Sequence, residues 1–283
     1  MSFCYINGFY KNNIDASISV EDRGFNFSDG VYEVIAFRKG KLLNFERHSK
    51  RLSKSLIDLQ IRIPFSNQNS LKIIIHHLLK LNDVDDGFLY LQITRGTAKR
   101  NHLFPYKVEP NIVISTFSKG GLDKIKKGVN IGLTKDQRWM RCDIKSISLL
   151  ANVLDKQRGF EKGFFEVWQL RKNLITEGTT SNAFIVKKNN HIYTHPKNNL
   201  ILGGVTRDCV IEIASKNNLK VIEKEFDIDD IKKCNEAFLT STTLGVVPVT
   251  KIEDIIINKK EIGLITKTLM KKLEDYLNKQ IYE

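Results

Sequence analysis

A single carboxylate beside small hydroxyl residues is the first feature of this sequence that could carry chemistry. Glu177 stands at the end of an expected strand, the next five residues read Gly-Thr-Thr-Ser-Asn, and the chain turns apolar again at Ala183. A buried carboxylate requires a cationic partner, and the protonated ring nitrogen of a bound cofactor would be one. The alternative is a glutamate in a polar hairpin, and this stretch alone does not decide between them.

A lysine earlier in the chain could supply a nucleophile. Lys145 follows the apolar Ile144 and precedes an expected helix start. Partial burial of its side chain would favour the neutral amine, which is the nucleophilic form. The alternative is that Lys145 is one of many exposed lysines.

Two further stretches could hold a phosphate. Residues 203–206, Gly-Gly-Val-Thr, come just before an expected helix, whose N–H groups and dipole would favour an anion, as would the Thr206 hydroxyl. Ser241 and Thr242 end a strand, and Arg51 could supply countercharge. Ordinary capping by Thr206 and Ser241 is the alternative. A phosphate site, a nucleophilic lysine and a carboxylate for a pyridinium together specify pyridoxal phosphate.

The N-terminal part of the chain must position Arg51. The patterns predict a turn at Asn7-Gly8, a hairpin turn at Lys39-Gly40, and strands over residues 31–37, 88–94 and 111–117. They also predict a helix that follows a capping Asn44, and a second helix from Ser66 or Asn67 to about Leu81.

The C-terminal part must position Lys145 and Glu177. We expect strands at 129–133, around Glu177 and at 237–240, and helices from Ser148 to about Gly159, over 207–216 and near the C-terminus. Strands and helices without strict alternation indicate an α+β fold with mixed sheets. The break at residues 118–121 predicts two domains, 1–118 and 124–283, joined by a linker over 119–123. The larger C-terminal domain would carry the lysine.

Composition narrows the class of protein. The chain has 283 residues, of which 41% are hydrophobic, and no apolar run has the roughly 18–20 residues that cross a bilayer. The start of the chain does not resemble a signal peptide. Four scattered cysteines, without metal-ligand spacing, indicate reduced thiols in a cytoplasmic protein that binds no metal. The net charge of +13 comes from lysines spread along the chain, which favours a solvated surface over nucleic-acid binding.

Several segments jointly resemble the motifs of class IV aminotransferases, which are pyridoxal-phosphate enzymes of fold type IV. The matching segments run in family order and spacing from about Tyr5 to Ile252, and they are residues 21–33, 48–52, 143–146, 177–184, 202–207 and 241–249. The resemblance implies a two-domain mixed α/β fold like that of D-amino-acid aminotransferases.

The resemblance also implies roles for single residues. Lys145 would form the internal Schiff base and shuttle a proton between the substrate α-carbon and the cofactor C4′. Glu177 would keep the pyridine nitrogen protonated, so that the ring accepts electrons. The other implied cofactor contacts are Arg51, Ser181, Asn182, Leu202, Val205, Thr206, Ser241 and Thr242.

A polar loop carries the expectation about substrate. Residues 100–105, Arg-Asn-His-Leu-Phe-Pro, resemble a loop of the D-amino-acid enzymes. The resemblance implies that Arg100 and His102 reach over from the second subunit of a homodimer and join Tyr32 in holding the substrate α-carboxylate, which fixes the α-hydrogen relative to the lysine. The alternative is a solvated basic loop. Lys99 stands where the D-amino-acid enzymes usually carry a proline, and Ala36 stands where they carry a longer polar residue. We expect these departures to affect which amino-acid side chain the substrate can have.

The expected reaction is transfer of the amino group of a D-amino acid, such as D-alanine, to 2-oxoglutarate, with pyruvate and D-glutamate as products. A branched-chain L-amino-acid aminotransferase or an aminodeoxychorismate lyase on the same fold is the alternative. A basic binding protein without catalysis is a third possibility, and the presence of both Lys145 and Glu177 argues against it.

Overall fold

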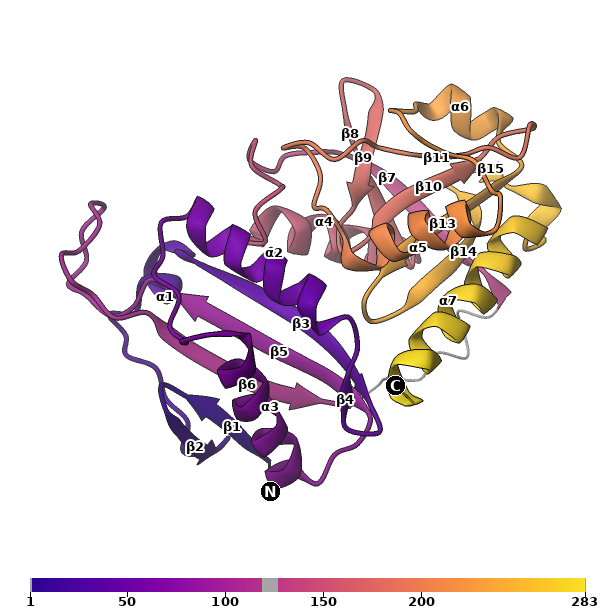
Figure 1. The fold of residues 1–283 in the computed structure, drawn as a ribbon. Helices are drawn as coiled ribbons and strands as arrows, with labels where there is room; N and C mark the ends of the chain where they lie inside the picture. Colours follow the sequence, from indigo (N-terminus) through magenta and orange to yellow (C-terminus); the bar gives the residue numbers. More distant parts are fainter. Residues whose placement is uncertain (1, 119–126, 283) are drawn as a thin grey trace. The chain divides into compact units, whose positions relative to one another are not determined.

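The computed structural model describes residues 2–118 and 127–282, which form two compact units (Figure 1). The first unit contains the described residues up to 118 together with Ile144–Ser148, and the second contains 127–143 and 149–282. The predicted linker, 119–123, lies outside the described residues. Each unit has its own sheet and its own apolar core.

The first unit is built on a six-stranded antiparallel sheet with the order β2-β1-β6-β5-β3-β4. Its strands are β1 (Phe3–Ile6), β2 (Phe9–Asn12), β3 (Gly30–Arg38), β4 (Lys41–Leu42), β5 (Gly87–Thr94) and β6 (Asn111–Phe117). The predicted turns at Asn7-Gly8 and Lys39-Gly40 are confirmed, and all four turn residues have positive φ. The strands predicted over 31–37, 88–94 and 111–117 are confirmed.

Three helices belong to this unit: α1 (Arg23–Phe27), α2 (Phe45–Asp58) and α3 (Gln68–Asn82). The buried face of β3 packs with Leu52 and Leu56 of α2 in one apolar cluster. The predicted start of the second helix at Ser66 or Asn67 is confirmed: Asn67 precedes α3, and its side chain accepts from the Ser70 N–H at 2.9 Å. The predicted cap at α2 is wrong: Asn44 takes a left-handed conformation and its side chain makes no capping bond.

The segment that carries Lys145 packs with the first unit, whereas the sequence placed this lysine in the C-terminal domain. Ser146 forms an antiparallel bridge with Val31. The Ile147 N–H donates to the Gly30 carbonyl at 3.1 Å, which ties the segment to the start of β3. Hydrogen bonds to residues more than a hundred positions away decide this assignment, and local sequence patterns do not report them.

The second unit is built on a nine-stranded mixed sheet with the path β12-β11-β10-β13-β14-β7-β8-β9, and β15 pairs with β14. Its strands are β7 (Val129–Lys135), β8 (Glu166–Arg171), β9 (Leu174–Gly178), β10 (Asn182–Val186), β11 (Ile192–Thr194), β12 (Val221–Glu223), β13 (Glu236–Ser241), β14 (Gly245–Ile252) and β15 (Ile255–Ile256). Parallel pairs join β14 to β7, β7 to β8 and β11 to β12, and the other pairs are antiparallel. The expected mixture of directions is confirmed.

The helical segments of this unit are α4 (Leu150–Glu161), α5 (Val205–Lys216), α6 (Ile228–Lys233), a 3-10 turn (Asn258–Lys260) and α7 (Leu264–Tyr282). The predicted cap at Ser148 is wrong, because α4 begins two residues later, at Leu150, and has no side-chain cap. Ser148 instead belongs to the segment that packs with the first unit. Apolar residues of α5 and α7 share a core cluster with Phe184 and Phe238 of the sheet.

Residues 2–118 and 127–282 show neither a membrane-spanning helix nor a cluster of metal ligands. No helix in these ranges is both long enough and apolar enough to cross a membrane. The same ranges contain no group of three or more His, Cys, Asp or Glu side chains that could hold a metal ion.

Candidate functional site

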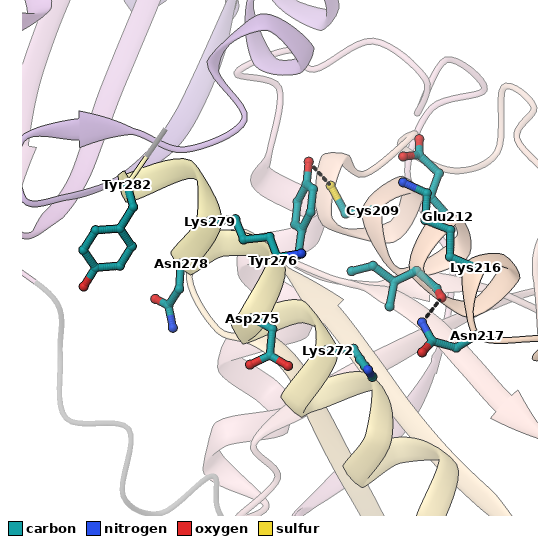
Figure 2. A pocket seen from close by; sticks show the side chains of 11 residues that line it. Cys209, Glu212, Lys216, Asn217, Lys272, Asp275, Tyr276, Asn278, Lys279 and Tyr282 are labelled. Carbon is teal, nitrogen blue, oxygen red and sulfur yellow. Dashed lines mark hydrogen bonds between the residues drawn. The ribbon is translucent and has the colours of Figure 1, made fainter.

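A groove of about 830 Å³ opens between α5 and α7 (Figure 2). Its wall includes Tyr276, whose hydroxyl lies 3.9 Å from the Cys209 sulfur, and the lysines Lys216, Lys272 and Lys279. None of the residues predicted to carry chemistry lines this groove. The predicted residues lie elsewhere, in clusters within each of the two units.

In the first unit, the amine of Lys145 lies over an aromatic ring. Its Nζ is 4.0 Å from the ring centroid of Tyr32. The backbone fixes this arrangement, because the Tyr32 N–H donates to the Lys145 carbonyl at 3.0 Å and the Lys145 N–H donates to the Ser55 hydroxyl at 3.1 Å. The structure thus brings together two predicted site residues, Lys145 and Tyr32, that are far apart in the sequence.

Arg51, which the sequence predicts to bind phosphate, is held by a carboxylate of the same unit. Its Nε donates to Glu33 at 2.7 Å and one terminal nitrogen donates to the same carboxylate at 2.9 Å. The His48 Nδ1 lies 2.7 Å from Glu33 Oε2, the oxygen that also accepts from the Arg51 terminal nitrogen. Glu33 has no exposed surface, so this carboxylate orients Arg51 from inside the core.

The role of Glu33 was not among the predicted sites, although the sequence contains a signal for it. Glu33 lies on β3 among the buried residues Val31, Ile35 and Phe37, where a charge interrupts a largely apolar strand. A carboxylate at such a position is costly without a cationic partner. The pattern could therefore have predicted a buried ion pair, though not that Arg51 would be the partner.

Burial and neighbouring charges shift the pKa values of this cluster in opposite directions. Burial alone would raise the pKa of Glu33, but Arg51 and His48 outweigh burial and hold that pKa well below its usual range. Burial lowers the pKa of His48 from its ordinary value of 6.5, against the opposing attraction of Glu33. The cluster therefore combines an ionised glutamate with a neutral histidine at neutral pH.

This arrangement predicts an acid-dependent loss of stability. A folded-state pKa below the unfolded value stabilises the protein above the unfolded pKa, and the contribution is lost as the pH falls. For His48 the loss begins near pH 6.5, and for Glu33 below pH 4.5. Lowering the pH from 7.5 to 5.5 should cost wild-type protein more free energy of unfolding than a His48→Gln variant, by at most about 1.4 kcal/mol, as measured by urea denaturation. His77→Gln, at an exposed site, is the control, and equal losses in wild type and His48→Gln would contradict the prediction.

The loop with Arg100 and His102 lies against α1 of the first unit. The Arg100 guanidinium is 5.1 Å from the ring centroid of Phe27, and the His102 ring is 5.3 Å from the same ring. Among the described residues, no hydrogen bond or ring contact joins Arg100 or His102 to Tyr32. Their predicted meeting with Tyr32 involves a second subunit and stays a prediction.

In the second unit, Glu177 is surrounded by donors. It lies near the end of β9, is 5% exposed, and accepts hydrogen bonds from Arg138, from the Asn182 amide at 3.0 Å and from the Leu202 N–H at 3.0 and 3.1 Å. Asn182 and Leu202 were both predicted to share a site with Glu177, and the structure brings all three together. The Asn182 amide also donates to the Leu202 carbonyl at 2.9 Å, which closes the cluster.

The sequence does not single out Arg138, which the structure places beside Glu177. Arg138 lies just beyond β7 and connects Glu177 to Asp136, whose carboxylate accepts from the Arg138 Nε at 3.0 Å and from a terminal nitrogen at 2.8 Å. Arg171 also contacts Asp136, at 3.2 Å. The need for a cation beside a buried Glu177 was the available signal, but the sequence reasoning assigned that charge to a cofactor alone.

The charged groups of this cluster shift one another's pKa values. Burial raises the pKa of Glu177, and Arg138 with the Leu202 N–H counteracts that rise. Burial alone would lower the pKa of Arg138, but the neighbouring carboxylates of Glu177 and Asp136 raise it above its ordinary value. Arg138 therefore stays cationic, and a carboxylate that accepts several hydrogen bonds beside this cation remains ionised.

The predicted phosphate residues lie close to Glu177 in the same unit. Gly204 precedes α5, whose first turn contains Val205 and Thr206 and has no side-chain cap, so its N–H groups can meet an anion. A side chain at Gly204 would lie 2.1 Å from the Asn182 oxygen, so only glycine fits there. On β13, Thr240 pairs with Asn182, which puts the following predicted residues, Ser241 and Thr242, at the end of the sheet where β10 begins.

The turn between Glu177 and Asn182 is held by a second buried carboxylate. Glu166, on β8, accepts from the Thr180 N–H at 3.2 Å and hydroxyl at 2.7 Å, from the Ser181 hydroxyl at 3.1 Å and from the Thr179 hydroxyl. The Ser181 hydroxyl thus donates to Glu166, and its predicted contact with a cofactor stays a prediction. The hydroxyl run noted in the sequence has a structural use, which is to fix this turn.

Comparison with known proteins gives a consistent family. The family model "Amino-transferase class IV" matches residues 30–252. The chain is 40% identical to a D-alanine aminotransferase of Bacillus licheniformis over 95% of each chain. It is 37% identical to a D-alanine aminotransferase of Staphylococcus epidermidis over 98% of each chain, and 38% identical to that of Staphylococcus aureus with the same coverage.

Solved structures show the same fold. The branched-chain aminotransferase of Escherichia coli superposes with a TM-score of 0.91, at 19% identity, over 98% of this chain and 94% of that one. That of the archaeon Thermoproteus uzoniensis, with norvaline, superposes with a TM-score of 0.89, at 21% identity, over 99% of this chain and 95% of that one. The predicted mixed α/β fold and the resemblance stated from the motifs are confirmed, and the chain belongs to the class IV aminotransferases.

Proposed function

We propose that this protein is a pyridoxal-phosphate-dependent aminotransferase that moves the amino group of D-alanine to 2-oxoglutarate, giving pyruvate and D-glutamate. The observation that carries the proposal is the likeness, along nearly the whole chain, to relatives described as D-alanine aminotransferases. The expectation of a D-amino-acid enzyme therefore agrees with these relatives. The branched-chain enzymes are similar at 19 and 21% identity, which shows the fold and does not extend to substrate.

The second unit has the donor set that pyridoxal phosphate needs. Glu177 is a buried, ionised carboxylate, so it can accept a hydrogen bond from a protonated pyridine nitrogen. The uncapped first turn of α5, at Val205 and Thr206, suits the phosphate. When bound, the cofactor supplies an electron sink for the bond that breaks at the substrate α-carbon.

Lys145 has the central role in this proposal. Its Nζ would hold the cofactor covalently and, with the cofactor bound, would accept the proton that leaves the substrate α-carbon. The Tyr32 ring under the amine and the hydrogen bonds on either side of Lys145 limit where that nitrogen can move. A restricted base transfers a proton along one direction, which is the basis of stereospecificity.

The remaining predicted residues hold the cofactor or the substrate. Glu177 would keep the pyridine nitrogen protonated, and Leu202 would pack against the ring. The groups that we assign to the phosphate or to its surroundings are Arg51, Ser181, Asn182, Val205, Thr206, Ser241 and Thr242. Arg51 takes this role with its orientation set by Glu33.

Recognition of the substrate requires a second copy of the chain. Arg100 and His102 of one subunit join Tyr32 of the other and bind the α-carboxylate, so the enzyme acts as a homodimer. A cation with two further donors fixes both the position and the rotation of a carboxylate. We place the enzyme in the cytoplasm, and the support is that none of the four cysteines, all described, forms a disulfide bond.

A substrate panel with both enantiomers tests the proposal. Purified holoenzyme with 2-oxoglutarate should form pyruvate from D-alanine, and the rate with L-alanine or L-leucine should be at least about a hundredfold lower. Activity with L-leucine alone would reject the D-amino-acid assignment in favour of a branched-chain enzyme. A protein without a borohydride-reducible chromophore would reject the aminotransferase assignment altogether.

A further inference from the structure

The buried arginine of the segment 21–33 contacts the loop that carries Arg100 and His102. Arg23, only 3% exposed, donates from one terminal nitrogen to the Asn101 carbonyl at 2.6 Å and to the Leu103 carbonyl at 3.4 Å. These two carbonyls flank His102 in the chain. Nothing in the proposed reaction uses Arg23 directly, so its burial at this loop calls for a separate explanation.

Arg23 is itself anchored through a shared carboxylate. Its Nε donates to Asp29 at 2.8 Å, and the same carboxylate accepts from the Arg95 Nε at 2.7 Å. Arg95 in turn donates to the carbonyls of Leu59 and Gln60, at the end of α2, at 2.8 and 2.9 Å. A continuous set of charge-assisted bonds therefore runs from the end of α2 to the middle of the loop.

Beside this point, the loop is also held by Arg95, whose guanidinium lies 3.6 Å from the ring centroid of Phe104. Its base is held by backbone bonds, from the Arg23 N–H to the Gly96 carbonyl at 2.9 Å and from the Ala98 N–H to the Glu21 carbonyl at 3.2 Å. Past Ala98, and up to Pro110, the hydrogen bonds that the described loop backbone receives from the rest of the unit come from Arg23. Figure 1 shows this stretch extending beyond α1 from the end of β5.

The ring of Phe27 supports the side chains of the loop. The Arg23 guanidinium lies 4.7 Å from its ring centroid, and the same ring contacts Arg100 and His102. Arg23 thus fixes the backbone on both sides of His102 and also the ring against which both side chains rest. A polar loop without such attachments would sample many conformations, and ordering it at each binding event would weaken binding.

We infer that Arg23 is a positioning residue for substrate recognition, because it holds the loop tip in the conformation in which Arg100 and His102 can meet a carboxylate. This inference rests on the proposed function, in which that pair binds the substrate α-carboxylate. A lysine cannot replace Arg23, since one ammonium group cannot reach Asp29 and two carbonyls with the fixed fork of a guanidinium.

The test compares Arg23→Lys with wild-type holoenzyme. Hydrogen–deuterium exchange of the peptide over residues 99–105 should become at least about tenfold faster. The KM for D-alanine should rise about tenfold or more while kcat stays within about twofold, because the loop affects binding of the carboxylate and not the proton transfer. Unchanged exchange, or faster exchange with an unchanged KM, would overturn the inference.

Two controls make the result specific. Arg62→Lys makes the same change at an exposed arginine that pairs with Glu109 at the far end of the loop, and it should alter neither readout. If Arg23→Lys does not fold, Phe27→Leu takes its place, with the same expected rise in KM and the same overturning results. Arg100→Leu separates the two claims: an unchanged KM there rejects the role of the loop in the proposed function, whereas a raised KM there with unaltered Arg23→Lys rejects only this inference.

Discussion

Lys145→Ala is expected to lose at least about 10⁴-fold in kcat for transamination while the protein keeps its fold. The amine is both the attachment point for the cofactor and the base at the α-carbon in the proposed reaction. The backbone of residue 145, which bonds to Tyr32 and Ser55, is unchanged by the substitution. The measurement is the rate of pyruvate formation from D-alanine, together with the mass of the borohydride-reduced protein.

The controls for this variant address folding and chemistry separately. Lys162→Ala removes an exposed lysine beyond α4 and should retain wild-type activity. Methylamine added to Lys145→Ala should restore part of the rate, because a free amine can take over proton transfer in the space left by the side chain. Wild-type turnover by Lys145→Ala, or a reduced adduct on a peptide without residue 145, would refute the assignment.

Replacing Arg138 with leucine should produce the largest loss of stability among the site variants. The substitution leaves two buried carboxylates, Glu177 and Asp136, without their shared cation. Removing one partner from a buried ion pair costs about 3–5 kcal/mol. Burial would then raise the pKa of Glu177 further, so that a neutral acid replaces the carboxylate that the pyridine nitrogen needs.

Arg141→Leu is the matched control, because Arg141 also makes two bonds to an aspartate two positions away, Asp143, at 3.0 and 3.1 Å. Its side chain is 46% exposed, so its loss should cost less than about 1 kcal/mol. The midpoints of urea denaturation of the apo-proteins at pH 7.5 give the comparison, and the dissociation constant of pyridoxal phosphate gives a second readout. Equal midpoints for the two variants would show that Arg138 does not stabilise the Glu177 cluster.

Local patterns in the sequence are sufficient for most elements, and the family motifs are sufficient for part of the site. Asn67 is recognisable as a cap because its side chain acts on a residue three positions away, Ser70. The small residues after Glu177 correctly indicate a tight turn at a strand end, and Asn182 and Leu202 are correctly grouped with Glu177. These features depend on contacts between neighbours in sequence or on motifs with fixed spacing.

The contacts that the sequence does not predict join residues that are far apart along the chain. Arg138 is one of many arginines until the fold brings β7 next to β8 and β9, where Glu177 lies. Glu33 could be flagged as a buried charge, but its pairing with Arg51 depends on how α2 crosses the sheet. The expected caps at Asn44 and Ser148 fail because residue type alone does not set backbone conformation at a helix start.

The short segment Ile144–Ser148 has a consequence for how this polypeptide can be made or divided. The chain leaves the first unit, returns to it for these five residues and leaves it again, so translation up to residue 118 cannot complete that unit. Its last piece emerges from the ribosome only after β7 of the other unit has been made. A gene cut after codon 118 would therefore encode one fragment with Tyr32 and another with Lys145, and the contact between that ring and the amine would form only when the two fragments reassociate.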